Sequence, residues 1–146
     1  ARTTWEGRFE VKRGLDRTFI FDGAHNAAGA ESFAMTYDEL FKDSPKTIVM
    51  AILKDKDQAA IIREVVKVGD TVLVVPAPTD RTEVPETLVE MIRRTVPKAT
   101  AQTADSIEAA LALAYKHTKT GDIIAVCGSL YILGDARQWF FHEMSH

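Results

Sequence analysis

The sequence is poor in the features that mark several large classes of protein. It contains one cysteine, Cys127, which excludes an internal disulfide framework and fits a cytoplasmic protein kept in a reducing environment. No apolar run approaches the roughly 18 residues that span a bilayer. The net charge of -3 offers no general attraction to nucleic acid or to an anionic membrane. The amino terminus has neither an initiator methionine nor a signal-peptide core, so we expect a fragment of a longer chain or a processed end.

Two common nucleotide-binding signatures are also missing. No glycine spacing matches the G-x-G-x-x-G fingerprint of dinucleotide-binding folds, and no G-x-x-x-x-G-K-[ST] phosphate-binding loop (P-loop) is present. These absences argue against a nicotinamide-dependent dehydrogenase and against a self-sufficient P-loop ATPase.

Short apolar runs rich in β-branched residues alternate with longer amphipathic segments along the chain. Four of these runs are nearly continuous in hydrophobicity, which is typical of strands covered on both faces of a parallel sheet. The predicted core strands are residues 18–21, 47–53, 71–75 and 123–127. A weaker strand is predicted at 98–102, and an edge strand at 8–11 is expected to form a hairpin with 18–21.

The segments between these runs have the 3.6-residue period of helices. The clearest apolar stripe consists of Ile107, Ala110, Leu111, Ala114 and Tyr115. Asp105 is expected to cap this helix, and Pro85 is tolerated in the first turn of another. Other helices are predicted within residues 27–41, 61–66, 88–92 and 133–140. We therefore predict one α/β domain over residues 1–146: a Rossmann-like open, mostly parallel sheet with helices on both faces and an antiparallel edge strand.

The loops after the predicted strands are the candidate sites, because ligands of open α/β sheets bind beyond the carboxyl ends of the strands. Residues 22–26 read Asp-Gly-Ala-His-Asn. Asp22 could accept hydrogen bonds from a ribose or orient His25, and Asn26 could cap the next helix. The alternative is a turn in which Asp22 and Asn26 are caps only, and residue chemistry alone slightly favours it.

Two further loops carry weaker signals. Gly128 and Ser129 follow the last core strand, where backbone N–H groups and a hydroxyl suit a carboxylate or phosphate, but Ser129 could equally be a helix cap. Residues 54–57 (Lys-Asp-Lys-Asp) are either a solvated helix entry capped by an aspartate or the source of a lysine for an anionic ligand. Cys127 lies in an apolar run and is expected to pack in the core.

The carboxyl end of the chain matches a metalloprotease signature. Residues 142–146 fit H-E-x-x-H, which places His142 and His146 one helical turn apart for zinc. The match ends the sequence, and no third ligand follows it. We therefore expect a chance match and no metal site.

Four stretches together resemble the folylpolyglutamate synthase/dihydrofolate synthase family of the Mur ligase group. Residues 5–10 (Trp-Glu-Gly-Arg-Phe-Glu) are similar to that family's W-P-G-R-x-E segment at the hinge into the second domain. Residues 22–26 match its D-G-A-H-N signature, 53–57 its L-K-D-K-D run, and 128–134 resemble its G-S-L-Y-L-x-G element. Glu6 and Ala27 stand where the family usually has proline, and neither change removes a functional group.

The resemblance implies the carboxy-terminal domain of an ATP-dependent ligase whose N-terminal P-loop ATPase domain is absent from this sequence. Such a ligase uses ATP, with Mg²⁺ held mainly by the missing domain, to convert a folate or pteroate carboxylate into an acyl phosphate that L-glutamate attacks. By this analogy Arg8 and His25 are catalytic. The residues assigned to ATP are Arg8, Asp22, His25 and Asn26, and those assigned to glutamate are His25, Lys56 and Ser129.

Two other functions stay open at this point. One is a non-catalytic α/β ligand-binding or interaction module, and the other is the equivalent domain of a Mur-type or poly-γ-glutamate ligase with another acceptor. From the order of the motifs and the continuous apolar strands, we expect Asp22, Lys56 and Ser129 to converge at one edge of the sheet.

Overall fold

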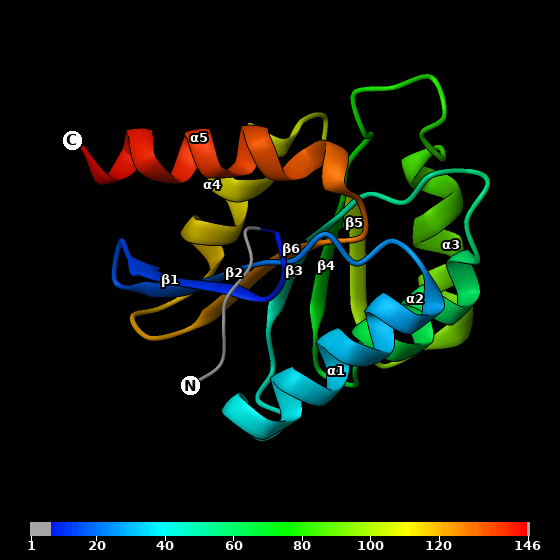
Figure 1. Ribbon diagram of the computed structural model, residues 1–146, viewed down its shortest axis with the longest axis horizontal. Helices are drawn as coiled ribbons and strands as arrows, with labels where there is room; N and C mark the ends of the chain where they lie inside the picture. Colours follow the sequence, from blue (N-terminus) through cyan, green and yellow to red (C-terminus); the bar gives the residue numbers. More distant parts are fainter. Residues whose placement is uncertain (1–6, 146) are drawn as a thin grey trace.

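The computed structural model describes residues 7–145, which form a six-stranded sheet between two layers of helices (Figure 1). The strand order is β1-β2-β6-β3-β4-β5. All neighbouring strands are parallel except β1 and β2, which form the antiparallel edge. This arrangement confirms the predicted fold class. The strands are β1 (Glu10–Gly14), β2 (Arg17–Phe21), β3 (Thr47–Met50), β4 (Thr71–Val74), β5 (Thr100–Thr103) and β6 (Ile123–Cys127).

Helices cover both faces of the sheet and divide the core into two halves. The helices are α1 (Ala27–Phe41), α2 (Gln58–Val65), α3 (Pro85–Thr95), α4 (Ile107–His117) and α5 (Leu133–Met144), with a short 3₁₀ helix η1 (Leu130–Ile132) before α5. One half of the core joins α1, α2 and α3 to the sheet face that carries Ile48 and Met50. The other half joins α4 and α5 to the face that carries Val49, and Figure 1 shows these two groups of helices on opposite sides. No helix among residues 7–145 is long and apolar enough to cross a bilayer.

The caps predicted from the sequence are present at α1 and α2, but the cap predicted for α4 is not. Asn26 accepts a hydrogen bond from Gly29 N at the start of α1, and Asp57 accepts one from Ala60 N at the start of α2. At α4 the predicted cap was wrong: Ser106 Oγ accepts from Ala109 N at 3.1 Å. The helix begins one residue later than the Asp105 cap requires, and Ser106 holds the extended backbone of an N-cap, with φ −153° and ψ 165°.

Three strands differ from the sequence prediction by two residues or more at one end. β1 lies at Glu10–Gly14 instead of 8–11, because Leu15 and Asp16 (φ 55° and 60°) make a two-residue turn that fixes the hairpin register. β3 ends at Met50, since the backbone of residues 52–54 bonds to residues 81–83 instead of continuing the ladder. β5 lies at Thr100–Thr103, shifted toward the carboxyl end from the predicted 98–102.

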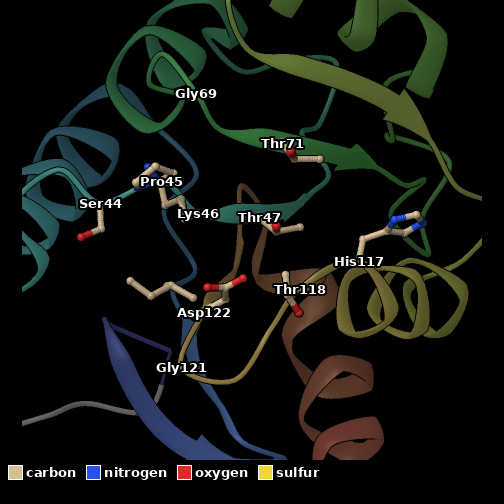
Figure 2. A pocket seen from close by; sticks show the side chains of 11 residues that line it. Ser44, Pro45, Lys46, Thr47, Gly69, Thr71, His117, Thr118, Gly121 and Asp122 are labelled. Carbon is tan, nitrogen blue, oxygen red and sulfur yellow. The ribbon is translucent and has the colours of Figure 1, made fainter.

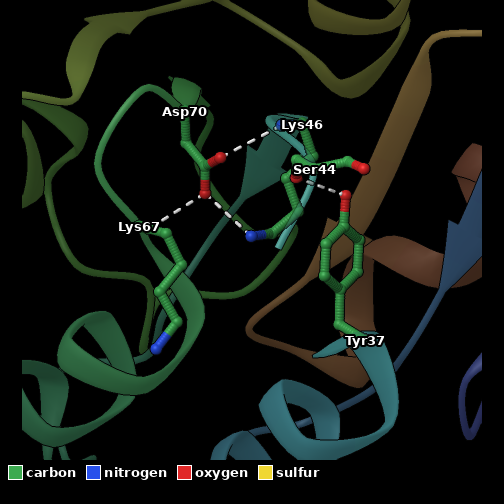
Figure 3. Close-up of polar contacts among 5 residues, drawn as sticks. All are labelled: Tyr37, Ser44, Lys46, Lys67 and Asp70. Carbon is green, nitrogen blue, oxygen red and sulfur yellow. Dashed lines mark hydrogen bonds and ion pairs between the residues drawn. The ribbon is translucent and has the colours of Figure 1, made fainter. Parts of the chain in front are cut away.

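A buried ion pair joins the starts of β3 and β4 (Figure 3). The Asp70 carboxylate accepts from Lys46 Nζ at 2.8 Å, from Lys46 N at 3.0 Å and from Lys67 N at 2.9 Å. Lys46 Nζ also lies 4.4 Å from the centre of the Tyr37 ring, and the Tyr37 hydroxyl donates to Ser44 O at 2.8 Å. These contacts fasten the end of α1 to the amino edge of the sheet.

Candidate functional site

The carboxyl ends of three neighbouring parallel strands place the candidate loops side by side. β6 pairs with β2 on one side and with β3 on the other, so the loops that begin at Asp22, Gly128 and Ala51 leave the same edge of the sheet. Asp22 N donates to Val126 O at 2.9 Å. Gly128 has a φ of +103° and packs so closely on the Ala51 carbonyl that a side chain there would collide with it.

A cavity of about 380 Å³ opens at this edge, between the segment that precedes β1 and the loop that follows β2. It brings together four residues that the sequence assigned to ATP, and Lys56 and Ser129 are not among its lining residues. The lining consists of Gly7, Arg8, Asp22, Gly23, Ala24, His25, Asn26, Ala28, Gly29, Ser32 and Leu130.

Asp22 lines this cavity and bonds to the backbone of two segments that border it. Its side chain is buried, and the two carboxylate oxygens accept from Ala24 N at 2.7 Å and from Phe9 N at 3.0 Å. Burial raises the pKa of this carboxyl above its ordinary value of 3.8, while the two backbone N–H groups and then Arg8 oppose that change. A carboxylate offers about four acceptor positions, so it can hold both backbone groups and still accept from a ligand hydroxyl.

The segment before β1, residues 7–9, lies directly on the loop after β2. Besides the bond from Phe9 to Asp22, Gly23 N donates to Gly7 O at 2.7 Å. A Cβ atom at Gly23 would collide with the Leu130 side chain, so glycine makes room for Leu130 beside this segment. Residues 7–9 therefore place the exposed Arg8 at the mouth of the cavity.

His25 and Asn26 present hydrogen-bonding groups to the cavity with defined polarity. His25 Nδ1 lies 2.9 Å from Gly23 O. A carbonyl oxygen only accepts, so Nδ1 carries the proton, and in the neutral ring Nε2 is left as the acceptor. Asn26 uses its side-chain oxygen to cap α1, at 2.8 Å from Gly29 N, which leaves its NH₂ group as the donor for a ligand.

Ser129 and Lys56 lie on the loops of the same edge but outside the cavity lining. Ser129 is buried, and its hydroxyl accepts from Tyr131 N at 3.1 Å, as the cap of η1. Lys56 is half-buried in the loop between β3 and α2, beside the exposed ion pair of Asp55 and Arg81 at 2.7 Å. The cap that the sequence offered as the alternative for Ser129 is present.

A second cavity, of about 410 Å³, lies at the opposite edge of the sheet (Figure 2). Its walls include the strand residues Thr47 and Thr71, and His117 at the end of α4. Lys46, which also lines it, is already paired with Asp70. Because ligands of open α/β sheets bind at the carboxyl edge, we place the candidate site in the first cavity.

The sequence also singled out Cys127 and the histidines of the H-E-x-x-H match, His142 and His146. Cys127 is fully buried, and burial raises the pKa of its thiol, so its predicted place in the core is confirmed. His142 lies in the last turn of α5, and His146 lies outside the described residues, as do Trp5 and Glu6. Among residues 7–145, no group of three or more His, Cys, Asp or Glu side chains could hold a metal ion.

Sequence reasoning missed two contributors to the site. Leu130 lines the cavity, and the sequence had placed it in the motif at 128–134 without predicting a role for it. The Glu10 carboxylate accepts from Arg137 Nε at 2.9 Å, a contact between residues that are distant in the sequence. The pattern of residues along the chain cannot predict this ion pair, because the pair depends on where α5 crosses the sheet.

Comparison with known proteins identifies a family that the chain matches. Residues 7–130 match the family described as "Mur ligase, glutamate ligase domain". Folylpolyglutamate synthase of Lacticaseibacillus casei is 30% identical over 138 residues, which cover 94% of this chain and 30% of that protein. The curated relatives are longer, and the chain spans between 15% and 34% of their length.

Solved structures of the same enzymes share the fold. Folylpolyglutamate synthase of Thermotoga maritima superposes with a TM-score of 0.78 at 28% identity, covering 94% of this chain and 31% of that one. The Mycobacterium tuberculosis enzyme complexed with ADP and AMPPCP gives 0.77 at 27% identity, covering 92% and 32%. With the family match over most of the chain, these likenesses establish that the chain belongs to the glutamate ligase domain family of the Mur ligases.

Proposed function

We propose that this chain is the carboxy-terminal domain of an ATP-dependent ligase that adds L-glutamate to a folate or pteroate carboxylate. The observation that carries the proposal is the cavity that gathers Arg8, Asp22, His25 and Asn26 at the carboxyl edge of the sheet. The nucleotides bound by the Mycobacterium tuberculosis enzyme support ATP as the ligand of this cavity. The chain spans about a third of such enzymes, so we assign the P-loop to an N-terminal ATPase domain outside this sequence.

The chemistry proposed for the whole ligase has two steps. A carboxylate oxygen of the pteroate or folate attacks the γ-phosphorus of ATP, which forms an acyl phosphate and releases ADP. The amino nitrogen of glutamate then attacks the acyl carbon, loses a proton, and expels inorganic phosphate as the amide forms. Both steps need water to be excluded, because water would hydrolyse the acyl phosphate. Closure of this domain over the ATPase domain would supply that exclusion.

We assign the nucleotide contacts to residues of the cavity. The Arg8 guanidinium reaches the phosphates, where its fixed positive charge stabilises the charge that develops during transfer. Asp22 accepts from the ribose, and Asn26 donates its side-chain NH₂ group. Mg²⁺ would neutralise phosphate charge, and we assign it mainly to the N-terminal domain; residues 7–145 contain no group of three or more His, Cys, Asp or Glu side chains that could hold a metal ion. We place the ligase in the cytoplasm, where a lone thiol such as Cys127 stays reduced.

Glutamate is proposed to lie between the cavity and the loops after β3 and β6. His25 stands at this junction, because its ring lines the cavity while its Nδ1 proton is held by Gly23 O. Its Nε2 faces the incoming amino acid in this proposal. Lys56 and Ser129 complete the glutamate site in the closed ligase, in which the two loops approach the cavity.

Kinetics of the full-length ligase test these assignments. Arg8→Ala should reduce kcat/KM for ATP, and His25→Ala should reduce the rate by roughly ten- to a hundredfold, the value of a charge-assisted contact. Ser129→Ala should mainly raise the KM for glutamate. Arg13→Ala is the matched control, since this exposed arginine of β1 lies outside the cavity lining.

Wild-type kinetics for all three variants at limiting ATP and at limiting glutamate would refute the proposal. The loops would then be structural turns, and the chain would be an α/β binding module. Normal use of ATP with another acceptor in place of folates would instead identify a different Mur-type ligase.

A further inference from the structure

A partly buried ion pair connects α5 to the start of β1, directly after the segment that carries Arg8. Arg137 Nε donates to Glu10 Oε1 at 2.9 Å, and the two side chains are only 17% and 16% exposed. Glu10 is the first residue of β1, two positions after Arg8, and pairs with Phe21 at the end of β2. The Arg137 guanidinium also lies 5.9 Å from the centre of the Phe21 ring.

The same arginine lies close to the segment before β1. A Cβ atom at Gly7 would lie 3.9 Å from Arg137 Nη2 and 3.5 Å from Cδ1 of Leu133, which also belongs to α5. One guanidinium therefore contacts or neighbours three parts of the site: the segment with Arg8, the first residue of β1, and the strand that ends before Asp22. It is not among the residues that line the cavity.

We propose that Glu10 and Arg137 form a positioning pair that holds residues 7–9 against the loop after β2, and so keeps Arg8 at the mouth of the cavity. The effect on catalysis rests on the proposed function, whereas the effect on residues 7–9 does not. Neither side chain touches the nucleotide. The pair acts through two backbone bonds, from Phe9 N to Asp22 and from Gly23 N to Gly7 O.

The chemistry of the pair suits this role. Arginine holds its charge at every physiological pH and has a planar group of fixed shape, so it fixes a direction as well as a distance. A half-buried pair is screened less by salt than an exposed one. Lys12 provides the contrast, because its Nζ lies 3.6 Å from the other oxygen of Glu10 but its side chain is 40% exposed.

Amide hydrogen exchange of the purified chain tests the structural part of the proposal. In Arg137→Gln and in Glu10→Gln, the amides of Phe9 and Gly23 should exchange faster by roughly tenfold or more, the value of a lost charged hydrogen bond. Core amides of β6 should be unchanged. Lys12→Gln is the matched control, since it removes a cation from the same carboxylate and should leave both amides protected.

The two substitutions should also be non-additive, because either one already breaks the pair. The double variant Glu10→Gln/Arg137→Gln should exchange no faster than the single ones. Unchanged protection of the Phe9 and Gly23 amides in all variants would overturn the proposal, and this outcome does not depend on the proposed function. Faster exchange throughout the core would also overturn it, since the pair would then support the whole fold.

Kinetics of the full-length ligase test the catalytic part. Arg137→Gln should raise the KM for ATP by roughly tenfold with a smaller change in kcat, and Arg137→Lys should restore part of the loss. Faster exchange at Phe9 with an unchanged KM for ATP would refute the positioning of Arg8. If Arg8→Ala itself has no effect, the proposed function fails separately, while the exchange result still stands.

Discussion

Among single residues, Asp22 combines two observed backbone contacts with one proposed ligand contact. It accepts from Phe9 N and Ala24 N, and in the proposed ligase it also accepts from the ribose. The sequence could not predict the hydrogen bond from Phe9 N to Asp22, because these residues come together only when the β1–β2 hairpin forms. The sequence did indicate the loop itself, since an apolar strand ends at Phe21 and Asp22 follows at once.

Asp22 should make the free energy of unfolding depend on pH. Because burial raises its pKa above 3.8, the folded protein binds a proton at pH values where the unfolded chain does not. This group therefore favours folding most below its unfolded-state pKa, and that advantage is lost as the pH rises through the folded-state pKa. Asp22→Asn lacks this dependence but keeps the shape of the side chain.

Denaturant unfolding of the two proteins, from neutral pH to about pH 4, measures the effect. The wild type should gain stability relative to Asp22→Asn as the pH falls. The loss of one backbone acceptor in the variant adds only a constant difference. A stability difference that does not change with pH would contradict the account.

Cys127 should be inert in the folded protein. It is fully buried in β6, and burial raises the pKa of its thiol, so the reactive thiolate is scarce at neutral pH. A thiol reagent should label it fully in denaturant and, under native conditions, no faster than the protein opens. Rapid labelling of the folded chain would show that β6 is accessible, which the structure does not allow.

At the scale of elements, the buried pair of Lys46 and Asp70 joins two strand starts and the end of α1. Removing one partner leaves the other charge buried, so Asp70→Ala should reduce the free energy of unfolding by about 3–5 kcal/mol. Asp55→Ala is the control, because its pair with Arg81 has a similar separation, 2.7 Å against 2.8 Å, but is exposed to solvent. It should change stability little.

Urea denaturation of both variants measures this difference. Equal stability of Asp70→Ala and the wild type would mean that the pair adds nothing to the net stability of the fold. A large loss in Asp55→Ala would mean that the loop between β3 and α2 depends on its surface charge.

The sequence predicted the existence of elements better than their ends. Continuous apolar runs indicated all four core strands, because both faces of each strand are covered. The ends depend on partners elsewhere in the chain: residues 52–54 leave the ladder to bond to 81–83, and the turn at Leu15 and Asp16 sets the register of β1. A single run of residues carries no information about such partners.

At the scale of the whole molecule, the fold class followed from the alternation of strands and helices, but the strand order did not. β6, the last strand in the chain, lies between β2 and β3. That position creates the site, because it brings the loop with Ser129 between the loops with Asp22 and Lys56. The sequence predicted that these loops share one edge of the sheet, because parallel strands end there, but it did not show which loop lies in the middle.

The chain alone should fold but should not ligate. Because the chain has its own core on both faces of the sheet, it should unfold cooperatively. ATP hydrolysis also needs backbone N–H groups that bind phosphate, a lysine and a Mg²⁺ ligand, which a P-loop supplies. Without these, nucleotide affinity should be poor, in the millimolar range or about 4 kcal/mol of binding free energy. An assay with ATP, Mg²⁺, glutamate and a pteroate should release no ADP, and thermal unfolding serves as its control for folding. Steady turnover by this chain would mean that the catalytic centre has been misplaced.

We expect the cavity beside Arg8 and Asp22 to face the nucleotide. Hydrogen–deuterium exchange of the full-length ligase, with and without a non-hydrolysable ATP analogue and Mg²⁺, tests this placement. The analogue should protect residues 7–9 and 22–29 and leave residues 44–47 and 117–122, at the second cavity, unchanged. Protection at the second cavity, with none at residues 7–9 and 22–29, would contradict it.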